Sequence, residues 1–187
     1  MRTRNSQRSS PPRALSARAT LRGATYATLF GLLAATGLRI SEARRLTQAD
    51  VDLDDAVLHI RATKFRKSRL VPLHPTVALA LRSYALRRDR AAQASSTAAI
   101  FVSSRRKPLP YSTVRAVFLC LRRALGWEQL DPRPRIHDLR HTFACRRLRD
   151  WYAAGVDVGP LVASLATYLG AASTYDPCLT PVLRSFR

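Results

Sequence analysis

The chain has only three cysteines and no long apolar run, and each of these shortages argues against a class of protein. The cysteines, Cys120, Cys145 and Cys178, contain no Cys-x-x-Cys pair, which excludes a zinc ribbon and argues against a disulfide framework. No apolar run approaches the roughly 20 residues of a membrane span, and the N-terminus lacks the apolar stretch of a secretory signal. We therefore expect a cytoplasmic protein with no membrane partner.

Positive charge dominates what is present. The 187 residues include 32 Lys+Arg against 12 Asp+Glu, a formal net charge of +20, and nearly all of the basic residues are arginines. Such an excess repels itself in a compact state and favours a polyanionic partner, and guanidinium groups can bind phosphate oxygens in pairs. Hydrophobic residues make up 47%, more than a disordered basic protein would contain. The composition thus predicts a folded domain that binds nucleic acid.

Apolar periodicity predicts a mainly helical domain with one small antiparallel sheet. Residues 1–22 carry arginines, serines and prolines but no acid, so we expect a flexible basic arm or linker there, followed by one domain over 23–187. Gly37 is expected to end the first helix and Ser41 to cap the second. Helices are predicted over about 24–36, 41–46, 75–88, 112–125, 137–154 and 160–169, and strands over 56–60, 69–73 and 99–102.

Two basic motifs lie in the first half of the chain. In the segment TGLRISE, the predicted helix end and helix start hold Arg39 at a tight corner, where its guanidinium could bind an anion or extend into solvent. In KFRKSRLVPL, Lys64 lies at the turn of a predicted two-stranded ribbon, where a lysine can reach into a groove and act as a general acid. The alternative for the second motif is a solvated run of charge.

A third motif is the segment HDLRH. On a helix His137, Arg140 and His141 share one face, and an imidazole beside a fixed positive charge suits proton transfer at a phosphate. One alternative is a pair of structural histidines, which fits His141 better than His137. Another is a zinc helix, but Arg140 would place a cation beside the metal and no third ligand is evident.

Taken together and in this order, the three motifs resemble the catalytic domain of the tyrosine recombinases, the phage integrase family. The similarity runs from about residue 21 to residue 170. It implies an α+β, mainly helical fold and site-specific DNA recombination or integration, in which DNA strands are cleaved and rejoined through a 3′-phosphotyrosine intermediate without metal or other cofactor. By resemblance, Arg39 and Arg140 bind the scissile phosphate, Lys64 protonates the leaving 5′ oxygen, and His137 assists proton transfer from a tyrosine.

The resemblance weakens from residue 171 onward. The family continues Leu-Gly-His with the nucleophilic tyrosine nine residues later, whereas here Ala171 occupies the histidine position and Thr180 stands nine residues on. Tyr175 is the best candidate nucleophile, and Tyr168 is expected to be a packing residue. From the resemblance we also expect a chain without the family's usual N-terminal core-binding domain. Two interpretations remain open: a minimal recombinase with a shifted tyrosine, or a truncated, catalytically impaired relative that acts as a non-catalytic DNA-binding protein.

Double-stranded DNA is the expected partner, bound chiefly through phosphate contacts, with a homo-multimer assembled on it. The expected DNA-binding side chains belong to the ribbon, to a second basic turn and to the third motif: Arg66, Lys67, Arg69, Arg105, Arg106, Lys107 and His141.

Overall fold

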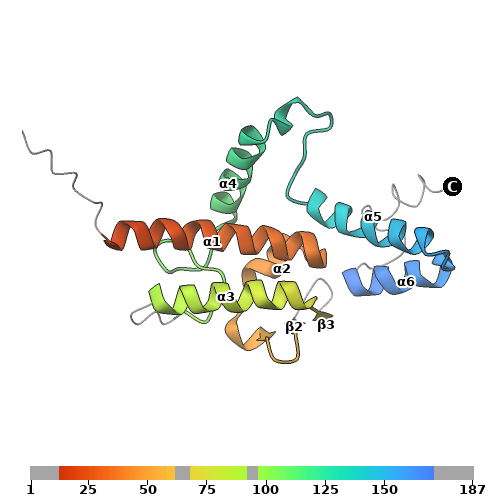
Figure 1. Cartoon of the computed structure of the whole chain (residues 1–187), viewed down its shortest axis with the longest axis horizontal. Helices are drawn as coiled ribbons and strands as arrows, with labels where there is room; N and C mark the ends of the chain where they lie inside the picture. Colours follow the sequence, from red (N-terminus) through yellow and green to blue (C-terminus); the bar gives the residue numbers. More distant parts are fainter. Residues whose placement is uncertain (1–12, 62–67, 92–96, 171–187) are drawn as a thin grey trace, which may run out of the picture.

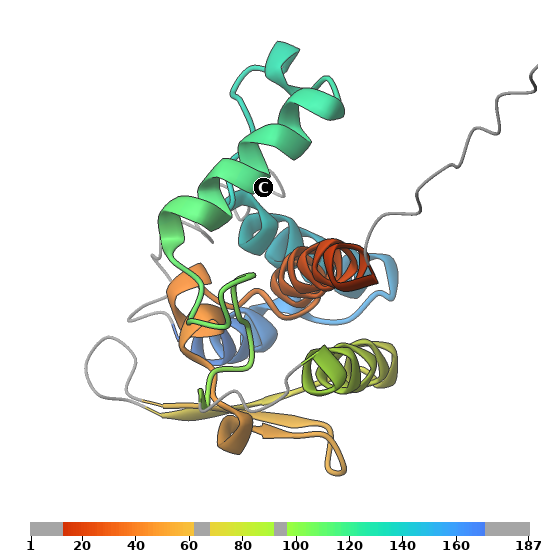
Figure 2. The same ribbon diagram turned by 90° about the vertical axis from the view of Figure 1, so that its left-hand side faces the viewer.

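The computed structural model describes residues 13–61, 68–91 and 97–170. Helix α1 (Arg13–Thr36) runs along the long axis with α3 (Pro75–Ala91) packed beside it, and α5 (Asp138–Ala153) and α6 (Val158–Leu169) lie beyond its C-terminal end (Figure 1). Helix α4 (Tyr111–Ala124) and the sheet lie on opposite sides of α1 (Figure 2). The predicted mainly helical α+β fold is confirmed.

Helix α1 begins eleven residues earlier than predicted, at Arg13 instead of about residue 24. Residues 13–22 were expected to belong to a flexible arm, but they form the first turns of α1, and residues 1–12 lie outside the described part of the chain. Alanine, leucine and arginine have the highest helix propensities, and this segment is rich in all three. Although α1 has 24 residues, none of the helices among the described residues is long and apolar enough to cross a membrane.

The sheet consists of β1 (Val51–Asp52), β2 (Val57–Ile60) and β3 (Arg69–Pro72), antiparallel in that order. Leu58 pairs with Val71 and both are buried, whereas their neighbours in sequence alternate to the surface, as expected for a sheet with one covered face. The predicted ribbon of β2 and β3 is therefore confirmed. Its turn, residues 62–67, is not among the described residues.

The predicted strand over 99–102 is wrong. This segment makes only isolated bridges, from Thr47 to Ala99 and from Val102 to Pro108. Ile100, Phe101 and Val102 are all buried in succession, so the apolar run reflects passage through the core and not pairing in a ladder.

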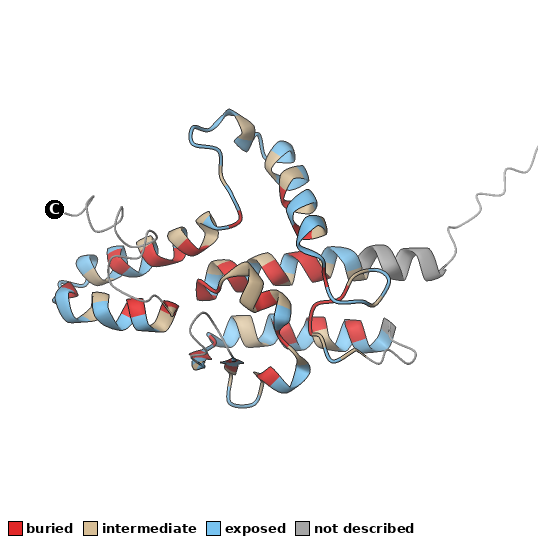
Figure 3. Cartoon of the chain, turned by 180° about the vertical axis from the view of Figure 1, so that it is seen from behind, coloured by how far each residue is buried: buried red, intermediate tan, exposed pale blue. Residues whose placement is uncertain are grey.

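Two apolar clusters meet at the C-terminal end of α1. The larger one packs the inner face of α1, with Leu29 and Leu33, against the sheet, α3 and the segment around Phe101. The smaller one joins α5 and α6 through residues such as Phe143 and Leu169. Figure 3 shows buried positions in red along these helices. The junction between them positions the polar site described below.

Helix α2 (Ile40–Arg45) follows the corner after α1, and it is not capped by Ser41 as predicted. Arg39 occupies the N-cap position. The backbone N–H of Arg39 donates to Glu42 Oε2 at 2.9 Å, so a carboxylate three residues into the helix satisfies the group that precedes it. This arrangement fixes the backbone from which the Arg39 side chain projects.

Candidate active site

Gly37 forms the corner between α1 and α2. Its φ of 64° lies in the left-handed region, and a Cβ there would come within 2.6 Å of Phe143 Cδ1 and 2.8 Å of Leu169 Cδ2. Only glycine fits both the dihedral angle and the space. The ends of α1, α5 and α6 can therefore approach closely, and the Gly37 carbonyl points to an arginine of α5.

That arginine is Arg140, which is buried to 2% exposure. Its Nη1 donates to the Gly37 carbonyl at 2.8 Å and its Nη2 to the Leu169 carbonyl at 2.9 Å. A buried charge requires such partners, because desolvation of an unsatisfied guanidinium is costly. The two carbonyls hold the guanidinium in one orientation at the C-terminal end of α6, where the helix dipole favours a cation.

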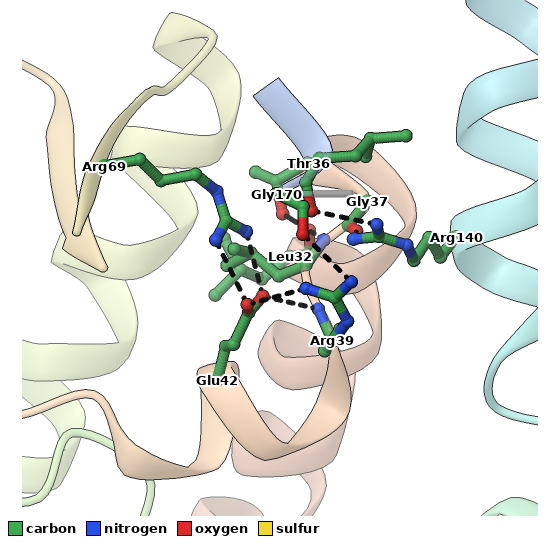
Figure 4. Close-up of polar contacts among 10 residues, drawn as sticks. Leu32, Thr36, Gly37, Arg39, Glu42, Arg69, Arg140 and Gly170 are labelled. Carbon is green, nitrogen blue, oxygen red and sulfur yellow. Dashed lines mark hydrogen bonds and ion pairs between the residues drawn. The ribbon is translucent and has the colours of Figure 1, made fainter. Parts of the chain in front are cut away.

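Arg39 reaches the same place from the start of α2. Its side chain is 28% exposed, its Nη2 donates to the Gly170 carbonyl at 3.1 Å, and its Nη1 lies 3.3 Å from Glu42 Oε1. The structure thus brings Arg39 and Arg140, which are far apart in sequence, onto consecutive carbonyls at the end of α6 (Figure 4).

Arg69 on β3 is a third guanidinium in this cluster, and its position differs from the prediction. It was expected on the DNA-facing surface, but its side chain is only 14% exposed and pairs with Glu42, with Nη1 to Oε1 at 3.1 Å and Nη2 to Oε2 at 2.9 Å. The β2–β3 register directs Arg69 inward, opposite Ile60. The sequence analysis did not predict the pairing of Arg69 with Glu42. The spacing of three residues between Arg39 and Glu42 was a signal only for the contact between those two side chains.

Glu42 is the carboxylate that these contacts share. Burial raises its pKa, but hydrogen bonds from Arg69 and from the Arg39 backbone, together with the charges of both guanidiniums, more than offset that effect. The pKa of Glu42 therefore lies below its ordinary value, and the group is ionised at neutral pH. Three guanidiniums and one carboxylate leave an excess of positive charge, which suits a phosphate group.

The two histidines of the third motif lie next to each other at the start of α5. His137 is the exposed N-cap residue of α5, and His141 is half-buried one turn further on. Their ring centroids are 5.4 Å apart and the ring planes are nearly perpendicular, at 86°. Arg140, which lies between the two histidines in the motif, is buried.

Tyr168 is a packing residue, as predicted. Its ring stacks on Phe143 with centroids 5.8 Å apart. Burial raises the pKa of its phenol, and the positive charges of Arg147, Arg69 and Arg140 offset only part of that rise. The neutral phenol is thus favoured, and Tyr168 supports the end of α6 from the apolar side.

The second basic turn lies away from the arginine cluster. Ser103 and Ser104, just before it, line a cavity of about 220 Å³ together with residues 21–26 of α1. This part of α1 lies about 20 Å from Gly37 at 1.5 Å per helical residue. The structure therefore separates Arg105, Arg106 and Lys107 from Arg39 and Arg140. The remaining predicted residues, Lys64, Arg66, Lys67 and Tyr175, lie outside the described residues.

A metal centre finds no support in the described ranges, where no three His, Cys, Asp or Glu side chains gather closely enough to hold an ion. The chemistry available at the end of α6 is that of positioned guanidiniums. Such groups can bind a phosphodiester and stabilise negative charge that develops on it.

Comparison with known proteins agrees with this geometry. The model of the phage integrase family matches residues 12–158. The protein y4rE of Sinorhizobium fredii, named as a candidate integrase/recombinase, is 46% identical over 83% of this chain and 50% of its own length. The tyrosine recombinase XerA of Thermococcus kodakarensis is 32% identical over 68% of this chain and 41% of its own length.

Solved structures show the same fold. A crystal structure of XerA recombinase superimposes with a TM-score of 0.66 at 24% identity, over 99% of this chain and 66% of that one. The Tn1549 transposon integrase in complex with transposon right end DNA gives 0.65 at 20% identity, over 99% and 62%. The chain spans about half the length of y4rE. From the matched family model and the shared fold, the chain belongs to the phage integrase family and has the fold of a tyrosine recombinase catalytic domain.

Proposed function

We propose that this chain is the catalytic domain of a site-specific recombinase that cleaves and rejoins duplex DNA through a 3′-phosphotyrosine intermediate. The observation that carries the proposal is the meeting of Arg39 and Arg140 at the end of α6. Family membership supports the same reaction class, and relatives and structural neighbours bear the names of recombinases and integrases.

In the proposed reaction the two arginines stabilise the scissile phosphate. A phenolic oxygen attacks phosphorus, the bond from phosphorus to the 5′ oxygen breaks, and negative charge grows on the non-bridging oxygens. Guanidiniums of Arg39 and Arg140 donate hydrogen bonds to those oxygens, and the fixed orientation of Arg140 lowers the cost of reorganisation during the step. The phosphotyrosine preserves the bond energy, so that rejoining requires no ATP.

The protons move through the remaining residues of the three motifs. His137 accepts the proton of the attacking phenol, and its exposed position at the start of α5 leaves it accessible to a bound substrate. Lys64 gives a proton to the leaving 5′ oxygen. Tyr175 supplies the phenol, because its position follows the helix end to which both arginines are bonded.

Duplex DNA is the proposed substrate, and other basic groups bind its flanking phosphates. Arg105, Arg106 and Lys107, which lie away from the arginine cluster, contact phosphates that flank the cleaved one. Several copies are expected to assemble on the DNA, in the cytoplasm.

A second candidate is a DNA-binding protein that no longer cleaves. The observation that favours it is Ala171 in the position of the family's second histidine, with Tyr175 closer to the glycine than the family pattern places it. In that case the cluster at the end of α6 binds a backbone phosphate without covalent chemistry.

Covalent trapping tests the two candidates. A pool of nicked duplexes with randomised sequence is incubated with the chain in EDTA without ATP, and DNA that stays attached after denaturation is recovered and sequenced. The proposal predicts an adduct that disappears in Tyr175→Phe. An adduct that persists in this variant shows that another residue is the nucleophile, and tight DNA binding without any adduct favours the second candidate.

A further inference from the structure

Glu42 lies between two arginines that hold it unequally (Figure 4). Arg69 contacts both carboxylate oxygens, at 2.9 and 3.1 Å, in the paired geometry that makes such bonds strong. The Arg39 guanidinium makes one longer contact with Glu42, at 3.3 Å, and also donates to the Gly170 carbonyl. The negative charge of Glu42 is therefore directed mainly to Arg69.

The exposed fractions of these side chains also distinguish Arg69 from Arg39. Glu42 and Arg69 are 7% and 14% exposed, whereas the Arg39 side chain is 28% exposed. Arg69 Nε is buried, with no hydrogen-bond partner among the described residues. Because a buried ion pair contributes little net stability compared with an apolar replacement, folding alone does not account for this pair.

Helix α6 ends directly against the pair. A Cβ on Gly170 would lie 2.8 Å from Arg69 Nη1 and 3.5 Å from Arg39 Nη1, and the φ of Gly170 is 64°. The guanidiniums of Arg69 and Arg39 are thus packed against one residue of the chain. A shift of Arg69 changes the space available to Arg39.

We propose that Arg69 is a positioning residue whose paired bonds to Glu42 prevent that carboxylate from neutralising Arg39, so that Arg39 keeps its charge and direction for a DNA phosphate. This inference rests on the proposed function and deepens it. It replaces the expected role of Arg69 as a direct DNA contact.

The proposal makes a specific statement about charge. In Arg69→Met, Glu42 loses its main partner and turns to Arg39, whose pairing with the carboxylate then competes with phosphate. In Arg69→Met combined with Glu42→Gln, the competing charge is gone as well. The excess positive charge of the cluster returns to that of the natural protein, so the double variant is expected to outperform the single one.

The experiment compares four forms of the full chain: natural, Arg69→Met, Glu42→Gln and the double variant. Duplex affinity and single-turnover adduct formation are measured for each on one trapped nicked sequence, after thermal unfolding has verified the fold. We expect Arg69→Met to form adduct at least about 30-fold more slowly than the natural protein. The double variant should form adduct at least about tenfold faster than Arg69→Met. An unchanged Arg69→Met, or a double variant as slow as the single one, overturns the proposal.

A pH profile adds a readout that a purely structural role would not change. The charged groups that face Glu42 are the guanidiniums of Arg39 and Arg69, and Arg140 lies at the same end of α6. Lowering the pH toward the pKa of Glu42 removes its competing charge, so the rate of Arg69→Met relative to the natural protein should rise. The Arg69→Lys variant keeps the charge without the paired geometry. Its rate of adduct formation should lie between the rates of the natural protein and of Arg69→Met.

An exposed ion pair serves as the matched control. Arg82 Nη2 lies 2.8 Å from Asp54 Oδ1 on the surface of α3, away from the cluster. Arg82→Met, alone or with Asp54→Asn, should leave adduct formation unchanged, and a loss equal to that of Arg69→Met would show a general charge effect.

Failure of the proposed function can be told apart from failure of this proposal. If the natural chain forms no adduct, the cleavage function fails, and the affinities of the four forms for a nicked duplex of randomised sequence then decide the role of Arg69. Weaker binding in Arg69→Met that the double variant restores supports the proposal, and equal affinities overturn it.

Discussion

Two groups of basic residues on this molecule, the arginines at the end of α6 and the turn around Arg105, differ in burial and bonding more than in charge. Around the end of α6, Arg140 and Arg69 are held by carbonyls and a carboxylate in single orientations. In the basic turn, Arg105 and Lys107 are exposed side chains on a short loop. A fixed guanidinium loses little entropy on meeting a transition state, whereas an exposed one mainly adds screened attraction.

The comparison predicts its largest effect at Arg140. In Arg140→Ala the carbonyls of Gly37 and Leu169 lose buried donors, which should lower the free energy of unfolding by about 3 kcal/mol. Adduct formation should fall by about 100-fold to 1000-fold, as for removal of one oxyanion donor. Chemical denaturation and single-turnover trapping measure the two effects, and a variant that keeps both stability and rate would contradict the account.

A second prediction concerns Gly37, the corner that lets the ends of α1, α5 and α6 approach one another. Gly37→Ala should destabilise the fold by about 3 kcal/mol, since it combines an unfavourable φ with overlap against Phe143 and Leu169. Gly126→Ala is the matched control, because Gly126 has a similar φ of 68° but no atom within 4 Å of a Cβ. It should cost only about 1 kcal/mol. Equal losses in the two variants would mean that close packing at Gly37 contributes nothing.

The ionised state of Glu42 gives a pH-dependent prediction. The pKa of Glu42 is lowered in the folded protein, so its contribution to stability is fully present above the ordinary carboxyl pKa of about 4.3 and is lost as the pH falls through the lowered value. Denaturation of the natural protein and of Glu42→Gln between neutral pH and pH 3 should show a smaller decline in the variant. Parallel declines would remove Glu42 as a source of the acid sensitivity.

The exposed turn should show the smallest effect. Replacing Arg105 and Lys107 with alanine should weaken DNA binding by a few fold. The slope of log K against log salt should become shallower by about 0.9 for each phosphate that the variant no longer neutralises. The rate of adduct formation at saturating DNA should stay the same. A large decrease in that rate would place the turn in the reaction site. It would contradict the distinction between the turn and the arginine cluster at the end of α6.

Much of this contrast could be predicted from sequence because helices and glycine corners leave local signals. The corner at Gly37 and the helix around Arg140 were both predicted from such signals. The meeting of the two guanidiniums at one phosphate was implied by the family resemblance alone. The start of α1 was missed because arginine favours helix formation and is also typical of nucleic-acid-binding arms. The basic residues of 13–22 were therefore interpreted as an arm, although the segment has a high helix propensity.

The pairing of Arg69 with Glu42 could not be predicted in the same way. Whether an arginine on a strand faces inward depends on the strand register, and whether it finds a carboxylate depends on where α2 packs. The alternation along β3 was visible, but nothing local in the sequence linked that strand to the first turn of α2. The same holds for the carbonyls at the end of α6, which no side-chain pattern reveals.

The central claim is that Arg39 and Arg140 act on one phosphate, and a double-mutant cycle tests it most directly. Single-turnover adduct formation is measured for the natural chain, Arg39→Lys, Arg140→Lys and the double variant, since lysine keeps the charge but not the forked geometry. The account predicts effects that are not additive, with a coupling of at least about 0.5 kcal/mol between the two sites. Strictly additive losses would show that the two arginines act independently and would contradict the account.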